Sequence, residues 1–218
     1  MDIKDEFVDY GLKTIRKNLE RQVKKEKIDQ SDMDNSLNRI MTTIDYSSLS
    51  DCDLVIEAAI ENQDIKLNIF KALDQICKEQ AILASNTSSI SITKIASATD
   101  RQNQIIGMHF MNPVPVMKLV EIVRGKETDD NTIAKIVELS EKMGKIPVEC
   151  NDSPGFISNR ILAPMINEAV FCLHEGVGTP EAIDTIMKLG MSHPMGPLTL
   201  ADLIGLDICL DIINVLHN

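Results

Sequence analysis

Short apolar runs alternate with amphipathic segments over the first 151 residues, and this alternation constrains the fold more than any other feature. The runs at residues 53–59 and 81–85 are too short for core helices and have the nearly continuous apolar pattern of buried parallel strands. A strand, a helix and a strand in this order form a βαβ unit, so the sequence predicts a parallel sheet covered by helices. The segment between the two runs carries its apolar residues at helical spacing, at Ile65, Ile69, Leu73 and Ile76.

The pattern changes at Asn151-Asp152-Ser153-Pro154-Gly155, a polar stretch with proline and glycine that is typical of a domain boundary. We therefore expect an α/β domain at residues 1–151 and an all-helical domain at residues 152–218. In the second domain helices are expected over 161–173, 180–189 and 205–217, with a turn at 193–197. The further elements expected in the first domain are helices at 3–23, 31–40 (capped by Ser31) and 130–143, and strands at 105–110, 117–123 and 146–150.

The composition excludes several classes of protein. The chain has 22 basic and 33 acidic side chains and a net charge of −11, which argues against a nucleic-acid partner. No apolar run approaches the ~20 residues of a membrane span, and the N-terminus lacks the pattern of a secretory signal. Five cysteines are scattered without ligand-like spacing. We expect a cytoplasmic protein with reduced thiols, no metal site and no contact with a membrane.

His109 is the residue that points most directly to chemistry. It lies between apolar strand residues and is followed twelve positions later by Glu121. A carboxylate beside an imidazole fixes its tautomer and stabilises the imidazolium that forms when the ring takes a proton. The spacing therefore favours a general acid/base pair. The alternative is a core histidine whose ring is satisfied by a structural hydrogen bond.

Five runs of residues carry a pattern in their order and spacing. They are Val55-Ile56-Glu57-Ala58-Ala59-Ile60-Glu61, Ser85-Asn86-Thr87-Ser88-Ser89, residues 109–121 (HFMNPVPVMKLVE), residues 154–160 (PGFISNR) and His193-Pro194-Met195-Gly196-Pro197. Each run alone is a modest signal, but five in register leave little room for coincidence. Together they resemble the L-3-hydroxyacyl-CoA dehydrogenase family, and most of all its bacterial 3-hydroxybutyryl-CoA dehydrogenases. The resemblance extends over essentially the whole chain.

The resemblance implies reversible oxidation of an L-3-hydroxyacyl-CoA to the 3-ketoacyl-CoA. His109 matches the catalytic base of the family and Glu121 its partner. Ser88 and Asn159 match polar residues that contact the reacting oxygen of the substrate, a task that uncharged hydroxyl and carboxamide groups suit. The alternatives are that Ser88 caps the following helix and that Asn159 is a polar residue in the first turn of a helix.

The same resemblance implies NAD as the cofactor. Asp2 matches the acid that ends the second strand of the nucleotide fold, and a carboxylate there favours NAD, although NADP stays open. Without the resemblance, the polar residues of the cleft would be interpreted as solvated residues of loops and helix starts. The residues that match this cleft are Glu61, Lys66, Asn86 and Asn112.

Positive charge on the first helix suggests where the polyanionic coenzyme A could bind. Lys25 and Lys27 stand at the end of this basic stretch, which resembles the CoA-contacting helix of the family. The alternative is a solvated helix face. The resemblance also implies an acyl-CoA partner and a homodimer for the full-length protein.

Both ends of the chain fall short of the family pattern. We expect an incomplete Rossmann-type doubly wound sheet without its first strand, glycine-rich loop, first helix and most of its second strand, followed by a truncated helical domain. Gly176-Val177-Gly178 is a poor imitation of the phosphate loop, since its context is helical. A non-catalytic fragment or binding domain is thus the alternative to the enzyme, and a structural protein of crystallin type is a third reading.

Overall fold

The computed structural model describes residues 1–217, which form two compact units. The first unit contains residues 1–52 and 75–78, and the second contains residues 53–74 and the chain from Glu79 onward. The second unit carries the sheet, so the expected catalytic residues all lie in it. Asp2, Lys25 and Lys27 lie in the first unit.

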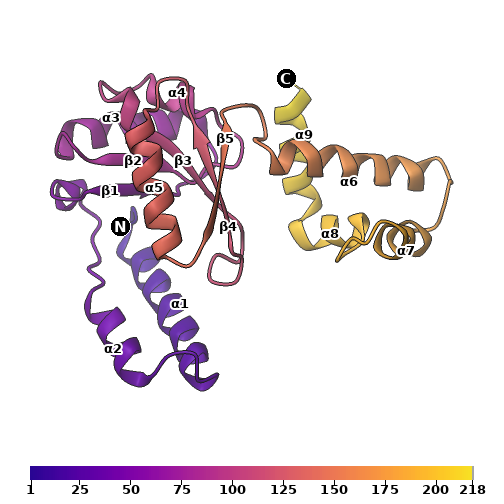
Figure 1. Cartoon of the computed structure of the whole chain (residues 1–218), viewed down its shortest axis with the longest axis horizontal. Helices are drawn as coiled ribbons and strands as arrows, with labels where there is room; N and C mark the ends of the chain where they lie inside the picture. Colours follow the sequence, from indigo (N-terminus) through magenta and orange to yellow (C-terminus); the bar gives the residue numbers. More distant parts are fainter. Residues whose placement is uncertain (218) are drawn as a thin grey trace. The chain divides into compact units, whose positions relative to one another are not determined.

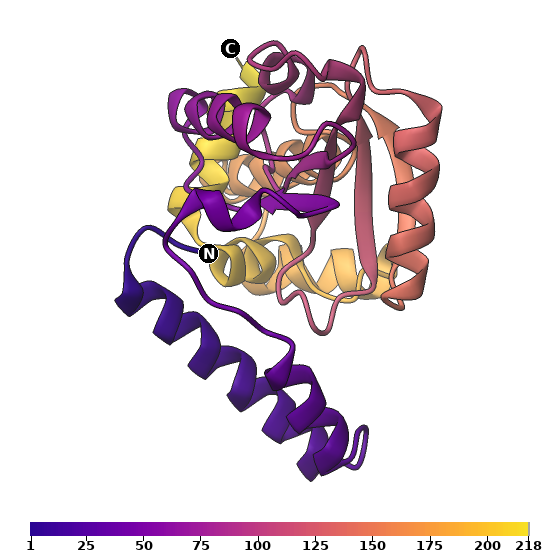
Figure 2. The same ribbon diagram turned by 90° about the vertical axis from the view of Figure 1, so that its left-hand side faces the viewer.

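Two helices, α1 and α2, make up most of the first unit and lie side by side in both ribbon views (Figure 1 and Figure 2). Acidic side chains in the first turn of α1 and basic ones in its last turn complement the helix dipole. The cap of α2 is Asp29, which exchanges hydrogen bonds with Asp32 in a capping box. The expectation that Ser31 caps this helix is therefore wrong. The elements are α1 (Asp5–Lys24), α2 (Gln30–Asn38) and a 3₁₀ turn at Tyr46–Leu49.

A five-stranded sheet with strand order β1-β2-β3-β4-β5 forms the centre of the second unit (Figure 1). All neighbouring pairs are parallel except β3 and β4, which are antiparallel. The connection at 111–118 explains the exception, because it is too short for the crossover that a parallel pair needs. The strands are β1 (Leu54–Glu57), β2 (Ile82–Ser85), β3 (Ile105–Phe110), β4 (Leu119–Arg124) and β5 (Ile146–Asn151).

Helices and side chains cover this sheet as the sequence predicts. Figure 2 shows α5 running along the strands, where Ile133 and Ile136 pack against buried residues of β3 and β4. The strand β2 is buried over its whole length, in keeping with its continuous apolar pattern. The α/β class is therefore confirmed. The helices of this part are α3 (Gln63–Ile76), α4 (Ile92–Ala96) and α5 (Asp130–Lys142), with a 3₁₀ turn at Gln102–Gln104.

The chain is helical after β5, as expected, but it contains a helix that the sequence pattern missed. Residues 193–204 are not a simple turn, because α8 begins at Pro197. Its first amide groups, those of Leu198 and Thr199, donate to the carboxylate of Asp184 in α7. A cap from another helix leaves no local signal in the sequence. The helices are α6 (Ser158–His174), α7 (Pro180–Gly190), α8 (Pro197–Ile204) and α9 (Leu206–His217).

Two global properties complete the description. Over residues 1–217, no helix is both long enough and apolar enough to cross a membrane. Within these residues, none of the five cysteines forms a disulfide.

Candidate active site

His109 and Glu121 face each other across the antiparallel strands β3 and β4. The strand register makes them direct partners, and the His109 Nδ1 atom lies 2.7 Å from Glu121 Oε2. Both residues are buried, with exposed fractions of 6% and 3%. Direct cross-strand neighbours lie on the same face of a sheet, so the twelve-residue spacing seen in the sequence becomes a close contact.

Glu121 also binds the start of α6. The residue that precedes this helix, Ile157, provides no side-chain cap. The Glu121 Oε1 atom instead accepts hydrogen bonds from the backbone amides of Ile157 and Ser158, at 3.3 and 3.0 Å, and Oε2 accepts one from Ser158 Oγ at 2.8 Å. A carboxylate from the sheet thus satisfies the free amides of a helix N-terminus.

These contacts decide the charge of Glu121. Burial alone would raise the pKa of this carboxyl group, but the hydrogen bonds from His109 and Ser158 outweigh burial and lower it. Glu121 is therefore ionised at neutral pH and accepts a hydrogen bond from His109 Nδ1–H. The other ring nitrogen, Nε2, then carries the lone pair that a general base needs. The ring of Phe156 packs edge-on against the imidazole, with centroids 5.8 Å apart.

Ser88 and Asn159 come from distant segments and meet in the structure. The Asn159 side-chain amide donates to the backbone oxygen of Ser88 at 3.1 Å. The alternative role of Ser88 as a helix cap is wrong, because Ser91 caps α4 by accepting from the amide of Lys94. Asn159 does lie in the first turn of α6, so its alternative reading and its proposed role are compatible.

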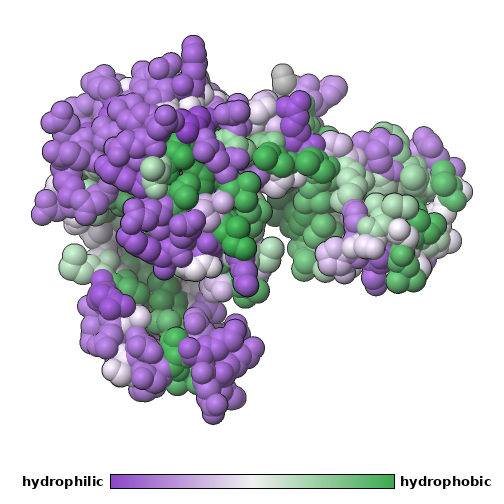
Figure 3. All heavy atoms as spheres, in the orientation of Figure 1, coloured by the Kyte–Doolittle hydropathy of each residue, from purple (hydrophilic) through white to green (hydrophobic). Residues whose placement is uncertain are grey.

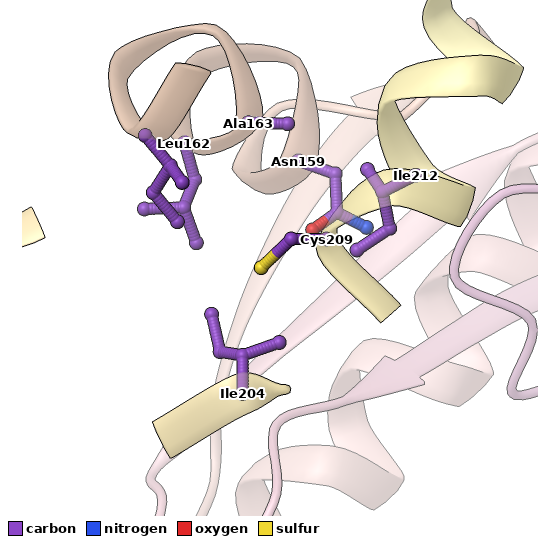
Figure 4. Close-up of a pocket in the computed structure, with 7 residues that line it drawn as sticks. Asn159, Leu162, Ala163, Ile204, Cys209 and Ile212 are labelled. Carbon is purple, nitrogen blue, oxygen red and sulfur yellow. The ribbon is translucent and has the colours of Figure 1, made fainter. Parts of the chain in front are cut away.

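Asn159 also borders a small apolar pocket among the C-terminal helices (Figure 4). Asn159 is the one lining residue with a strongly polar side chain, and the others are apolar or, in the case of Cys209, only weakly polar. They belong to α6, α8 and α9. The other lining residues are Leu162, Ala163, Ile166, Ile204, Cys209 and Ile212.

Glu61 anchors the loop that carries Ser88. Its Oε1 atom accepts hydrogen bonds from the backbone amides of Ser88 and Ser89, both at 3.0 Å, and from the hydroxyls of Thr87 and Ser89. Burial opposes ionisation of Glu61, but these hydrogen bonds and the charge of Lys66 lower its pKa overall. An ionised carboxylate therefore holds the loop that follows β2.

Lys66 is buried rather than solvated, with only 1% of its surface exposed. Its Nζ atom lies 2.7 Å from Glu57 Oε1 and 3.5 Å from Glu61 Oε2. The alternative reading of Lys66 as surface polarity is therefore wrong. Glu57 was not among the sequence candidates, although an acidic residue inside the apolar run Leu54-Val55-Ile56-Glu57 is a signal that could have found it.

The remaining cofactor candidates have different environments. Asn86 joins the ends of two strands, because its Oδ1 accepts from the backbone amide of Phe110 at 2.9 Å. Asn112 is exposed in the connection between β3 and β4. Glu61, Lys66, Asn86 and Asn112 thus all follow the carboxyl ends of β1, β2 and β3, the edge where doubly wound sheets bind nucleotides.

Hydroxyl and amide groups of NAD fit this edge in donor and acceptor character. The Glu61 side chain keeps 40% of its surface exposed, so a charged acceptor is accessible there. Within residues 1–217 no glycine-rich turn joins a strand to a helix. The Gly176-Val177-Gly178 segment connects two helices, α6 and α7, as the sequence suggested.

The other three candidates lie in the first unit. Asp2 is exposed and accepts a hydrogen bond from the amide of Ile3 at 2.7 Å. Lys25 ends α1 and Lys27 follows it, both with exposed side chains. Arg160 donates to Ser153 Oγ at 2.8 Å and so ties α6 to the preceding turn.

Comparisons with known proteins identify the family. Residues 1–153 match the family model described as 3-hydroxyacyl-CoA dehydrogenase, NAD binding domain, and residues 155–218 match the C-terminal domain of the same family. A probable 3-hydroxybutyryl-CoA dehydrogenase of Deinococcus radiodurans is 58% identical over 99% of this chain and 77% of its own length. A probable enzyme of the same name from Bacillus subtilis is 54% identical over 100% of this chain and 76% of its own length.

The solved structures agree. The (S)-3-hydroxybutyryl-CoA dehydrogenase of Ralstonia eutropha superposes with a TM-score of 0.97 at 52% identity, over 100% of this chain and 77% of that one. The two family models together account for nearly every residue of the sequence. The chain therefore belongs to the 3-hydroxyacyl-CoA dehydrogenase family, with an N-terminal part of the NAD-binding type and a helical C-terminal part.

Proposed function

We propose that this protein is an NAD-dependent 3-hydroxybutyryl-CoA dehydrogenase, which reversibly oxidises an L-3-hydroxyacyl-CoA to the 3-ketoacyl-CoA. The observation that carries this proposal is the buried hydrogen bond between His109 and an ionised Glu121. A solvent-excluded imidazole whose Nδ1 is already engaged is arranged to exchange a proton through Nε2. The relatives named above support the choice of substrate class.

In this proposal the residues of the chain manage the proton and the orientation of the substrate. His109 Nε2 takes the hydroxyl proton, and Glu121 stabilises the resulting imidazolium. Ser88 and Asn159 hold the reacting oxygen with neutral groups that can both donate to a ketone and accept from an alcohol. NAD, held by the residues at the carboxyl edge of the sheet, would supply the hydride chemistry at the carbon that bears this oxygen.

The domain roles follow from the same proposal. Residues 1–151 hold the cofactor through Asp2, Glu61, Lys66, Asn86 and Asn112, and residues 152–218 hold the acyl-CoA substrate together with Ser88. The carboxylate of Asp2 disfavours the 2′-phosphate of NADP. Lys25 and Lys27 supply positive charge for the phosphates of coenzyme A in a protein whose net charge is −11.

A cytoplasmic location is part of the proposal and rests on five cysteines that form no disulfide, since oxidising compartments favour disulfides. Fractionation of the source cells tests it. Recovery of the protein outside the cytoplasm would contradict the assignment.

The first prediction concerns the base. In a chain extended at both ends to the length of its curated relatives, His109→Gln should lower kcat for acetoacetyl-CoA reduction by about 10² to 10⁴, with a smaller effect on KM. Steady-state kinetics that follow NADH absorbance measure this. The same substitution at the exposed His174, in the last turn of α6, is the matched control and should leave kcat unchanged. Near-normal turnover of His109→Gln would contradict the assignment of His109 as the general base.

The second prediction concerns the charge of Glu121. Because folding lowers the pKa of this carboxyl group, its contribution to stability is present above the ordinary carboxyl value of 4.5 and is lost as the pH falls through the lower folded value. Glu121→Gln should therefore reduce the free energy of unfolding by about 1.5 to 3 kcal/mol at pH 7, and by less at pH 3.5.

Urea denaturation of the 218-residue chain at the two pH values measures this difference. Glu127→Gln, which removes an exposed carboxylate, is the control and should change stability little at either pH. If Glu121→Gln lowers the free energy of unfolding equally at pH 7 and pH 3.5, the charge of Glu121 is not the source of the effect.

The third prediction concerns coenzyme A. In the extended chain, Lys25→Glu combined with Lys27→Glu should raise KM for acetoacetyl-CoA and weaken its dependence on salt, while a short thioester without the nucleotide is hardly affected. The control is the double variant Lys135→Glu and Lys142→Glu on α5, which makes the same change in charge. Equal effects of the two double variants would show that Lys25 and Lys27 contribute only general surface charge.

We also propose that the protein is a homodimer. Figure 3 shows apolar surface gathered over the C-terminal helices. Leu189 in α7 and Leu203 in α8 are 80% and 70% exposed. Patches of this kind mark association sites. Leu189→Glu combined with Leu203→Glu should give a monomer in sedimentation equilibrium, whereas Met41→Glu, at a 90% exposed position in the first unit, should leave the dimer intact. A monomeric wild-type protein would contradict this proposal.

A further inference from the structure

Glu57 is a buried carboxylate that the chemistry described above does not use. It ends β1 and is 5% exposed. Its Oε1 atom accepts hydrogen bonds from Lys66 Nζ at 2.7 Å and from the amide of Ala59 at 2.5 Å, and its Oε2 atom accepts one from Ser85 Oγ at 2.7 Å. Apolar side chains often replace a buried ion pair without loss of stability. Stability is thus a weak reason for placing this charge inside the sheet edge.

Lys66 connects Glu57 to the candidate site. Its ammonium group has three protons and three acceptors, namely Glu57 Oε1, the backbone oxygen of Ala59 at 3.1 Å and Glu61 Oε2 at 3.5 Å. The contact with Glu57 is the shortest. Glu57 therefore determines where the ammonium group lies, and Glu61 receives only the weaker share of its attraction.

Glu61 links Lys66 to the loop that carries Ser88. One of its oxygens is occupied by Thr87, Ser88 and Ser89, and the other faces Lys66 at 3.5 Å. Without the charge of Glu57, Glu61 would be the only carboxylate beside a buried ammonium ion. The stronger attraction would draw Glu61 toward Lys66 and away from the amides of the loop.

We propose that Glu57 is a positioning residue for the cofactor. It holds Lys66 so that Glu61 keeps the Ser88 loop in place and leaves one carboxylate oxygen accessible to a hydroxyl group of the cofactor. This inference rests on the proposed function for the identity of the ligand. The arrangement of the loop itself does not depend on it.

Hydrogen exchange without cofactor tests the arrangement directly. In the 218-residue chain, Glu57→Gln should speed exchange of the Ser88 and Ser89 amides by about tenfold, while amides in the middle of β4 exchange as in the wild type. Glu127→Gln, an exposed change of the same kind, should alter neither. Unchanged exchange at Ser88 and Ser89 would overturn the proposal, and so would faster exchange that is uniform over the sheet.

Cofactor binding provides the second readout. In the extended chain, Glu57→Gln should raise the Kd for NADH, measured by cofactor fluorescence, by about three- to tenfold. Because Glu57 acts through Lys66, the double variant Glu57→Gln and Lys66→Met should bind NADH no more weakly than Lys66→Met alone. Additive losses would show that Glu57 does not act through Lys66.

The double variant also guards against misfolding, since it removes both charges instead of leaving one buried and unpaired. If Glu57→Gln does not fold, near-wild-type exchange at Ser88 and Ser89 in the folded double variant supports the proposal, because no ammonium group remains to draw Glu61 away from the loop. Faster exchange there overturns it. A wild-type protein that binds no NADH would contradict the proposed function. The exchange measurement would still decide whether Glu57 positions the loop.

Discussion

The carboxylate of Glu121 is the interaction on which the rest of the second unit depends. It is buried in the sheet, and it binds both the imidazole of His109 and the first amides of α6. Either partner alone would leave part of a buried charge unsatisfied. Together they keep Glu121 ionised, fix the tautomer of His109 and set where the helical segment begins.

The turn before α6 allows this arrangement. Gly155 has a φ of +73°, and a side chain there would come within 3.0 Å of the Arg160 amide nitrogen. Phe156 follows in the left-handed region at +51° and packs against the imidazole. The tight turn aims the amides of Ile157 and Ser158 at the sheet, so backbone conformation and the charge of Glu121 depend on each other.

Much of this architecture can be predicted from the sequence because local patterns of apolar and polar residues determine it. The strands and the longer helices follow apolar periodicity, and the His109–Glu121 contact follows from two strands joined by a short connection. Patterns of this kind fail where the partner is remote in the chain. The amides of α8 find Asp184 in another helix, and α2 starts at Asp29 rather than Ser31 because Asp32 completes a reciprocal cap.

Glu57 and Lys66 show the same limit within the candidate site. Periodicity places Glu57 in a strand, yet only the fold shows that its oxygens meet Lys66 and Ser85 across the sheet edge. The resemblance therefore identified Glu61 and Lys66 but not the carboxylate that forms the shortest ion pair with Lys66. The charge of a buried carboxylate also affects neighbouring side chains. Burial and the charge of Glu121 raise the pKa of the Cys150 thiol to about 11.

The two buried carboxylates, Glu57 and Glu121, have related tasks at the same edge of the sheet. Each fixes a nitrogen group, an ammonium in one case and an imidazole in the other, and each is linked to a segment that carries a polar candidate residue. The two segments meet where the Asn159 amide donates to the Ser88 backbone oxygen. A shift of the loop that Glu61 holds would therefore move Ser88 relative to Asn159.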